Sequence, residues 1–266
     1  MAVRTIFSMA EECARGEREG WREFVRDYAG IARQLLELYF PALAPEVEAH
    51  VAALFQRARA NGSAWFQGLK FSNEREFAMS FRELVFAYGR EQAKVPTPEI
   101  SIEQYAQVIQ DLTLIERELL WLFVKGYTAA QIAPIMMNAA ATAEAVKKIA
   151  DQRLAQILPA ASKDAFNVSA RVLTEAAEKS AGEHCLSLKT FNNLINGQLT
   201  WRERELAEEH MRACFNCLDR FTSFQEMIRY RKDAEPLAES GIESVLAGLA
   251  LPPAKKKGFF GKLLAR

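Results

Sequence analysis

Histidine and cysteine gather in one short stretch of this 266-residue chain. Two of the three histidines and three of the four cysteines lie between residues 184 and 217. Within that stretch, His210, Cys214 and Cys217 follow the spacing H-x-x-x-C-x-x-C. On one helix, or on a helix that ends near the second cysteine, this spacing puts an imidazole and two thiols on the same side. These are ligand types that zinc prefers, so the stretch predicts a Zn2+ site.

A structural zinc site takes four nitrogen or sulfur ligands, so a fourth residue is needed. Cys185, 25 residues before His210, is the expected ligand, and His184 is the alternative. A site closed by four protein ligands leaves no position for a substrate, so we expect a structural centre and no catalytic residues. Two alternatives remain: the C-x-x-C thiols are buried small hydrophobes, or Cys214 and Cys217 form a redox pair, although the strand-helix-strand context usual for such a pair is absent. A variant of the zinc site is a redox switch, in which Cys185 pairs with Cys214 on oxidation and ejects zinc.

Short helices must position these ligands. An apolar stripe over 191–195 predicts a helix that Gly197 ends, and Thr200 with Glu203 predicts a capping box at the start of the next helix. A further stripe follows the ligands, and either core packing or the clamping of a partner explains it (Leu218, Phe221, Phe224, Met227 and Ile228).

Similar patterns along the chain predict an all-α fold. Apolar residues recur at helical spacing between Trp21 and Leu38 until Pro41, and no segment alternates in the manner of a strand. Capping boxes are predicted at five places (Ser8 with Glu11, Thr113 with Glu116, Thr128 with Gln131, Thr200 with Glu203, and Ser240 with Glu243).

The composition excludes several classes of protein. Thirty-four basic and 34 acidic residues give no net charge, so a chain-wide basic field for nucleic acid is absent. No apolar run approaches the roughly 18 residues of a membrane span, and the N-terminus turns acidic too early for a signal peptide. We therefore expect a cytoplasmic protein. Prolines and composition shifts divide the chain into the segments 1–93, 94–160, 161–236 and 237–266.

Residues 112–158 have the order of a helix-turn-helix. A helix ends near Gly126, Thr128 begins a short helix, a turn follows near residues 138–141, and a longer helix begins at Thr142. An ordinary three-helix core would have the same order.

This segment resembles the promoter-reading domain of extracytoplasmic-function sigma factors. The matching residues are Arg117, Leu122, Gly126, Gln131, Ile132, Ala133, Thr142, Ala150, Arg153 and Leu154. Residues 9–93 resemble, more faintly, the polymerase-binding N-terminal domain of the same family, with Phe71, Glu76, Phe77 and the run 81–91 at its last helix. The resemblance implies RNA polymerase core and promoter DNA as partners.

The departures from the family concern DNA binding. Residues 101–160 carry five basic and six acidic side chains, whereas phosphate contacts need cations. Glu144 and Asp151 stand where the family is basic, and Pro134 is expected to kink the first helix of the motif. The cations that remain for weak DNA contacts are Lys147, Lys148 and Arg153.

The cysteine-rich segment resembles the zinc-binding anti-sigma domain, in which H-x-x-x-C-x-x-C follows a Cys or His by some 25 residues. This resemblance implies helices that clamp a sigma factor. Together the two resemblances indicate a transcription regulator made of sigma-like helical domains and a fused zinc-binding module, with a sigma or anti-sigma partner. The alternative is a degenerate sigma fold that serves as a protein-interaction scaffold. No catalytic constellation is present, so we do not expect an enzyme.

The C-terminal tail differs in composition from the rest of the chain. Residues 254–266 hold five basic side chains and no acid. Its apolar residues fall at helical spacing, which predicts peripheral contact with an anionic membrane surface. The alternatives are a solvated basic end and a small patch that tethers DNA. The candidate membrane residues are Lys255, Lys256, Lys257, Phe259, Phe260, Lys262, Leu263 and Leu264.

Overall fold

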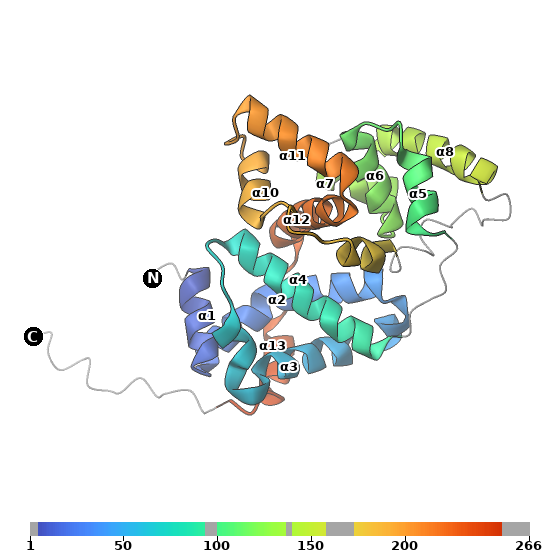
Figure 1. The fold of residues 1–266 in the computed structure, drawn as a ribbon. Helices are drawn as coiled ribbons and strands as arrows, with labels where there is room; N and C mark the ends of the chain where they lie inside the picture. Colours follow the sequence, from blue (N-terminus) through green and yellow to red (C-terminus); the bar gives the residue numbers. More distant parts are fainter. Residues whose placement is uncertain (1–4, 94–99, 137–139, 158–172, 252–266) are drawn as a thin grey trace, which may run out of the picture. The chain divides into compact units, whose positions relative to one another are not determined.

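The computed structural model describes residues 5–93, 100–136, 140–157 and 173–251 (Figure 1). Every regular element among these residues is a helix and none is a strand, which confirms the all-α prediction. In chain order the helices are α1 (Ile6–Ala14), α2 (Arg18–Tyr39), the 3-10 helix η1 (Pro41–Glu46), α3 (Val47–Gly68), α4 (Glu74–Gln92), α5 (Ile102–Ile109), α6 (Leu114–Val124), α7 (Ala129–Met136), α8 (Ala140–Ile157), α10 (Leu188–Ile195), α11 (Trp201–Ala213), α12 (Phe215–Asp233) and α13 (Glu239–Ala247). A further helical stretch covers residues 173–179.

The chain divides into two compact units. The first contains the described parts of 1–33, 48–71 and 234–266, and the second contains those of 34–47 and 72–233. The second unit therefore holds both the helix-turn-helix segment and the cysteine-rich segment. The boundaries expected after residues 93 and 160 fall next to or within stretches that the structure does not describe.

Side-chain caps define several helix starts. The predicted capping boxes of Thr113, Thr128 and Thr200 are confirmed. Two predictions are wrong. Thr5 caps α1, and Ser8 is the third helical residue and the other half of that box, because its hydroxyl accepts from the amide of Thr5 at 3.1 Å.

The predicted box of Ser240 with Glu243 is also wrong. Helix α13 begins after Ala238 without a side-chain cap, and Ser240 lies within the helix. The acid of that expected box is engaged elsewhere, since Glu243 pairs with Arg18 and Arg22 of α2.

Aromatic packing forms the core of the first unit. The ring of Phe24 lies 5.0 Å from the rings of both Phe55 and Phe66, centroid to centroid, and the Trp21 indole donates a hydrogen bond to the carbonyl oxygen of Cys13 at 3.1 Å. Trp21, Phe24 and Phe55 are completely buried. The amphipathic stripe expected before Pro41 thus forms α2 and supplies this core.

Helix α12 lies at the centre of contacts in the second unit. It contacts α4, α6, α7 and α11, while α8 contacts α5, α6 and α7 (Figure 1). Within α6, Trp121 is completely buried and its ring lies 5.2 Å from that of Tyr105 on α5. The helix-turn-helix segment therefore packs through α6 and α7 against the helix that carries Cys217, the last of the predicted metal ligands.

Two glycines make local features of this unit possible. Gly126 has a φ of +94° directly after α6, a backbone conformation that most other residues avoid. Gly89 lies against Phe40, whose ring would be only 2.3 Å from a Cβ at that position. Close approach of this ring to α4 therefore requires glycine.

No helix in the described part of the chain is long and apolar enough to cross a membrane.

Candidate metal centre

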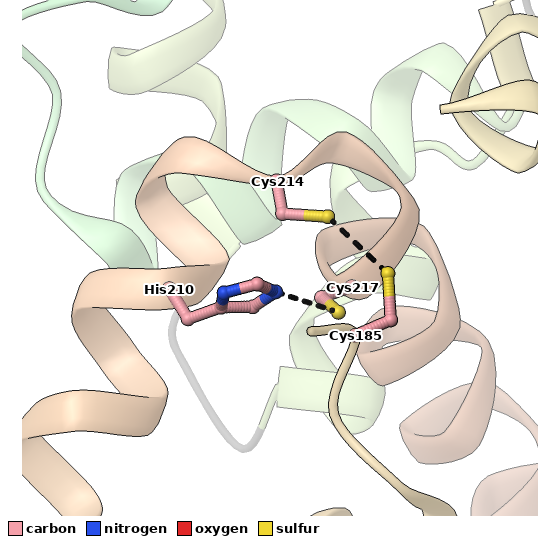
Figure 2. Close-up of side chains that lie close together, drawn as sticks. All are labelled: Cys185, His210, Cys214 and Cys217. Atoms are coloured by element: carbon pink, nitrogen blue, oxygen red, sulfur yellow. Dashed lines mark hydrogen bonds between the residues drawn. The ribbon is translucent and has the colours of Figure 1, made fainter. Parts of the chain in front are cut away.

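Four side chains that are separated in the sequence converge on one point. The nitrogen and sulfur atoms of Cys185, His210, Cys214 and Cys217 all lie within 4.8 Å of one another. Figure 2 shows these side chains directed toward a common centre. All three cysteines are free thiols. The four side chains could hold one metal ion.

The distances suit a tetrahedral site. The sulfurs of Cys185 and Cys214 are 3.8 Å apart, and the His210 Nε2 lies 3.2 Å from the Cys217 sulfur (Figure 2). Four sulfurs at about 2.3 Å from a tetrahedral ion lie about 3.8 Å from one another. The cluster therefore needs only small adjustments to enclose an ion.

A single extended residue between two helices brings the ligands together. Helix α11 carries His210, and Cys214 ends that helix with φ −115° and ψ 107°. The Cys214 amide donates to the His210 carbonyl at 2.9 Å, and the Cys214 carbonyl accepts from Leu218 at 3.0 Å. Cys217 lies in the first turn of α12. The sequence predicted that the helix ends near Cys217. In the structure it ends earlier, at Cys214, and the next helix carries Cys217.

A turn before α10 supplies the fourth side chain. The Cys185 amide donates to the Gly182 carbonyl at 3.1 Å, and the Gly182 amide donates back to the Cys185 sulfur at 3.2 Å. This turn directs Cys185 toward the cluster, whereas His184 is exposed and is not part of it. Of the two predicted alternatives, the geometry brings only Cys185 to the other ligands.

Amide donors surround the sulfurs. The Leu186 amide donates to the Cys217 sulfur at 3.2 Å, and the Asn216 side chain donates to the Cys185 sulfur at 3.2 Å. Arg220 fixes the same turn through the Leu186 carbonyl at 3.0 Å. Hydrogen bonds to sulfur favour the thiolate, which is the form that binds metals. The sequence analysis missed Asn216 and Arg220, although both lie within three residues of Cys217.

The thiols differ in acidity. Burial raises the pKa of the Cys217 thiol to about 12, and the nearby Cys214 adds to this effect. The pKa of Cys185 is lowered, chiefly by the hydrogen bond from Gly182. A cation would reverse the burial penalty on Cys217, so metal binding and deprotonation are coupled here.

Beyond the ligands, α12 carries buried acids that face one cation of α4 and one at the residue directly after α6. The carboxylate of Asp219 lies 3.3 Å from the Lys125 ammonium, and that of Glu226 lies 3.4 Å from the Arg82 guanidinium. All four side chains are at most 5% exposed. The sequence analysis did not identify any of them.

Neutral groups complete this network. The Asp219 carboxylate accepts from the Trp121 indole at 2.9 Å, and Lys125 donates to the Ser223 hydroxyl at 2.7 Å. Burial alone would raise the pKa of Asp219, but Lys125 and then Arg82 hold that pKa below its ordinary value. The Asp219 side chain is therefore ionised, and its charge is compensated by Lys125, which follows α6, and by Arg82 of α4.

Glu226 has further partners. Its carboxylate accepts from the hydroxyl of Tyr39 at 2.8 Å and from that of Tyr127. The guanidinium of Arg82 also lies over the ring of Phe86, 3.9 Å from its centroid. Glu226 on α12 is therefore hydrogen-bonded by Tyr39 of α2, Arg82 of α4 and Tyr127, which lies between α6 and α7.

The candidate DNA-contacting cations are mostly engaged within the protein. Lys147 pairs with Asp151 at 2.8 Å, and Arg153 donates to the Val108 carbonyl at 2.9 Å. Lys148 is exposed. Helix α7 runs through Pro134 and ends two residues later, and α8 begins at Ala140, two residues before the expected Thr142.

The candidate membrane residues of the tail, between 255 and 264, lie outside the described residues. Comparison of the chain with family models, characterised proteins and solved structures finds no match.

Proposed function

We propose that this chain is a transcription regulator in which a zinc-bearing module holds sigma-like helices of the same chain. The observation that carries the proposal is the pairing of Asp219 and Glu226 on α12 with Lys125 and Arg82. Arg82 belongs to the helix that resembles the end of the sigma N-terminal domain. Lys125 directly follows the first helix of the promoter-reading segment. One helix of the metal-bearing segment thus contacts both sigma-like parts.

The polar character of this interface supports a holding role. Buried ion pairs contribute less to stability than apolar packing of the same volume, yet removing one partner leaves an unpaired buried charge. Such contacts favour one specific arrangement of α12 against α4 and α6. They are also typical of surfaces that separate, which are more polar than permanent cores.

The proposed metal is zinc with a structural role. Three thiolates and one imidazole suit zinc, which would link α11, α12 and the turn at Cys185 without offering a position to a substrate. Bound zinc neutralises thiolate charge and supplies folding free energy. Since Cys217 lies in the first turn of α12, the metal would fix the start of the helix that carries Asp219 and Glu226.

A second candidate function is an interaction scaffold that has lost promoter reading. Lys147 and Arg153 both have partners within the protein, which favours this alternative. Few phosphates can be neutralised by the cations that remain, so DNA binding should be weak with a shallow dependence on salt. Lysine at Glu144 and Asp151 should strengthen it about equally on all sequences.

Capture of RNA polymerase tests the leading proposal. The full-length chain and the variant D219N/E226Q are compared as baits for purified core polymerase. The wild type should retain little polymerase. The variant should retain more, because α12 no longer carries the acids that pair with Lys125 and Arg82. The matched control is E74Q, which removes an exposed pair with Arg231 in the same unit. Absence of polymerase from every bait would reject the sigma-type function and support the scaffold.

A further inference from the structure

A pocket opens among α6, α7, α10, α11 and α12, and none of the four candidate metal ligands is among its lining residues. Its volume is about 720 Å³, within the range of about 300–1,000 Å³ that small-molecule sites occupy. Nine of its thirteen lining residues are apolar. Two of them, Ile115 and Ile195, are 56% and 37% exposed, so apolar surface at this pocket faces water.

One buried carboxylate in this pocket has no cation to compensate it. Glu118 of α6 is only 4% exposed, and its carboxylate accepts a hydrogen bond from the side-chain amide of Gln225 at 3.1 Å. No lysine or arginine of the described chain forms an ion pair with it, in contrast to Asp219 and Glu226. Burying a carboxylate without a countercharge is costly, so this position favours a cation.

Gln225 provides a second, independent sign of a missing group. Its side-chain oxygen is buried and accepts no hydrogen bond from any described residue, while its side-chain nitrogen donates to the carboxylate of Glu118. Buried polar atoms without partners are uncommon in folded proteins. Side by side, α6 therefore offers a carboxylate without a countercharge and α12 offers an amide oxygen without a donor.

The charged groups around the pocket do not supply the missing charge. Glu208 of α11 forms ion pairs with Arg204 at 2.7 Å and with Arg212 at 3.9 Å. The side chains of these two arginines are 66% and 50% exposed. Helix α7 has no ionisable side chain. On α8, Lys147 is paired with Asp151. The local balance at Glu118 therefore remains negative when its carboxyl is ionised.

We propose that this pocket binds a small apolar organic cation, whose ammonium group pairs with Glu118 and donates to Gln225. The apolar body of the ligand covers Ile115, Ile195 and Phe221. Binding does not depend on the sigma-type function. Since the lining comes from α6 and α7 on one hand and α10 to α12 on the other, a bound ligand would stabilise their packing by mass action.

Matched eight-carbon probes test the proposal on the full-length protein. Octylammonium, 1-octanol and octanoate share one alkyl chain and differ only in the head group. Calorimetry should show that octylammonium binds about tenfold more tightly than 1-octanol, with octanoate weakest. In E118Q the preference for the ammonium should disappear, whereas E74Q should retain it.

A second variant keeps the proposal testable if E118Q does not fold. Ile115 is exposed, so I115S should fold normally, weaken all three probes alike and keep their order. Equal affinity for the three probes, an unchanged preference in E118Q, or the absence of binding by octylammonium would each overturn the proposal.

Discussion

The carboxylate of Glu226 lies 3.4 Å from the guanidinium of Arg82, and the two residues are 144 positions apart. The Glu226 side chain is fully buried and that of Arg82 is 5% exposed. Because neither charge can be hydrated by bulk water, each depends on the other. This pair joins α4 to α12 and makes their packing specific.

Neutralising one member of this pair should destabilise the second unit. E226Q or R82M leaves an unpaired buried charge and should lower the free energy of unfolding by about 3–5 kcal/mol. The double variant R82M/E226Q should lose less than the sum of the two. Urea unfolding of all four forms completes the cycle. The exposed pair of Glu74 and Arg231 is the control, and E74Q should cost less than about 1 kcal/mol. Additive losses in the buried pair would contradict this prediction.

Metal content should depend on Cys185 and not on His184. The purified chain should carry one zinc ion, and C185S, H210A, C214S and C217S should each lose it, because a four-ligand site tolerates no missing donor. H184A and C13S, which lie outside the cluster, should retain it. Elemental analysis together with thermal unfolding measures both content and stability. Zinc retained by C185S and lost by H184A would reverse the assignment.

Glu118 should make stability depend on pH. Burial is the main cause that raises its pKa to about 7, compared with about 4.3 in an unfolded chain. The folded state therefore holds this proton more tightly, so the stabilisation from this one group is greatest below about pH 4 and falls as pH rises toward 7. The total loss from this group is about 4 kcal/mol.

E118Q removes this loss and supplies the measurement. The stability of E118Q relative to wild type should grow by about 2 kcal/mol between pH 5.5 and pH 8. Urea unfolding of both proteins at the two pH values measures this difference in the free energy of unfolding. Because the cysteines are the same in both proteins, their titration cancels in the difference. A difference that does not vary with pH would show that Glu118 titrates normally.

The basic tail should confer binding to anionic membranes. Five cations near anionic headgroups contribute about 1 kcal/mol each, and the apolar residues add insertion into the interface. The full chain should float with vesicles that contain anionic lipid, and a chain that ends at Pro253 should not. Neutral vesicles are the control. Equal flotation of both chains would reject a role for the tail.

Patterns within a few residues were enough to predict the local structure. The all-α class follows from apolar spacing, and three of the five capping boxes form as predicted, because a cap depends on residues three positions apart. Where two caps were wrong, at Ser8 and Ser240, a competing start lay within three residues. The ligands His210, Cys214 and Cys217 share this local character.

Tertiary structure alone decided the rest. His184 and Cys185 are neighbours with equally suitable donors, and only the turn at Gly182 directs the cysteine to the cluster. Asp219, Glu226, Lys125 and Arg82 resemble ordinary surface charges in the sequence, yet they are buried as partners from distant helices. The physical reason is that burial of a charge depends on which helix packs over it, and helical periodicity contains no information about that partner.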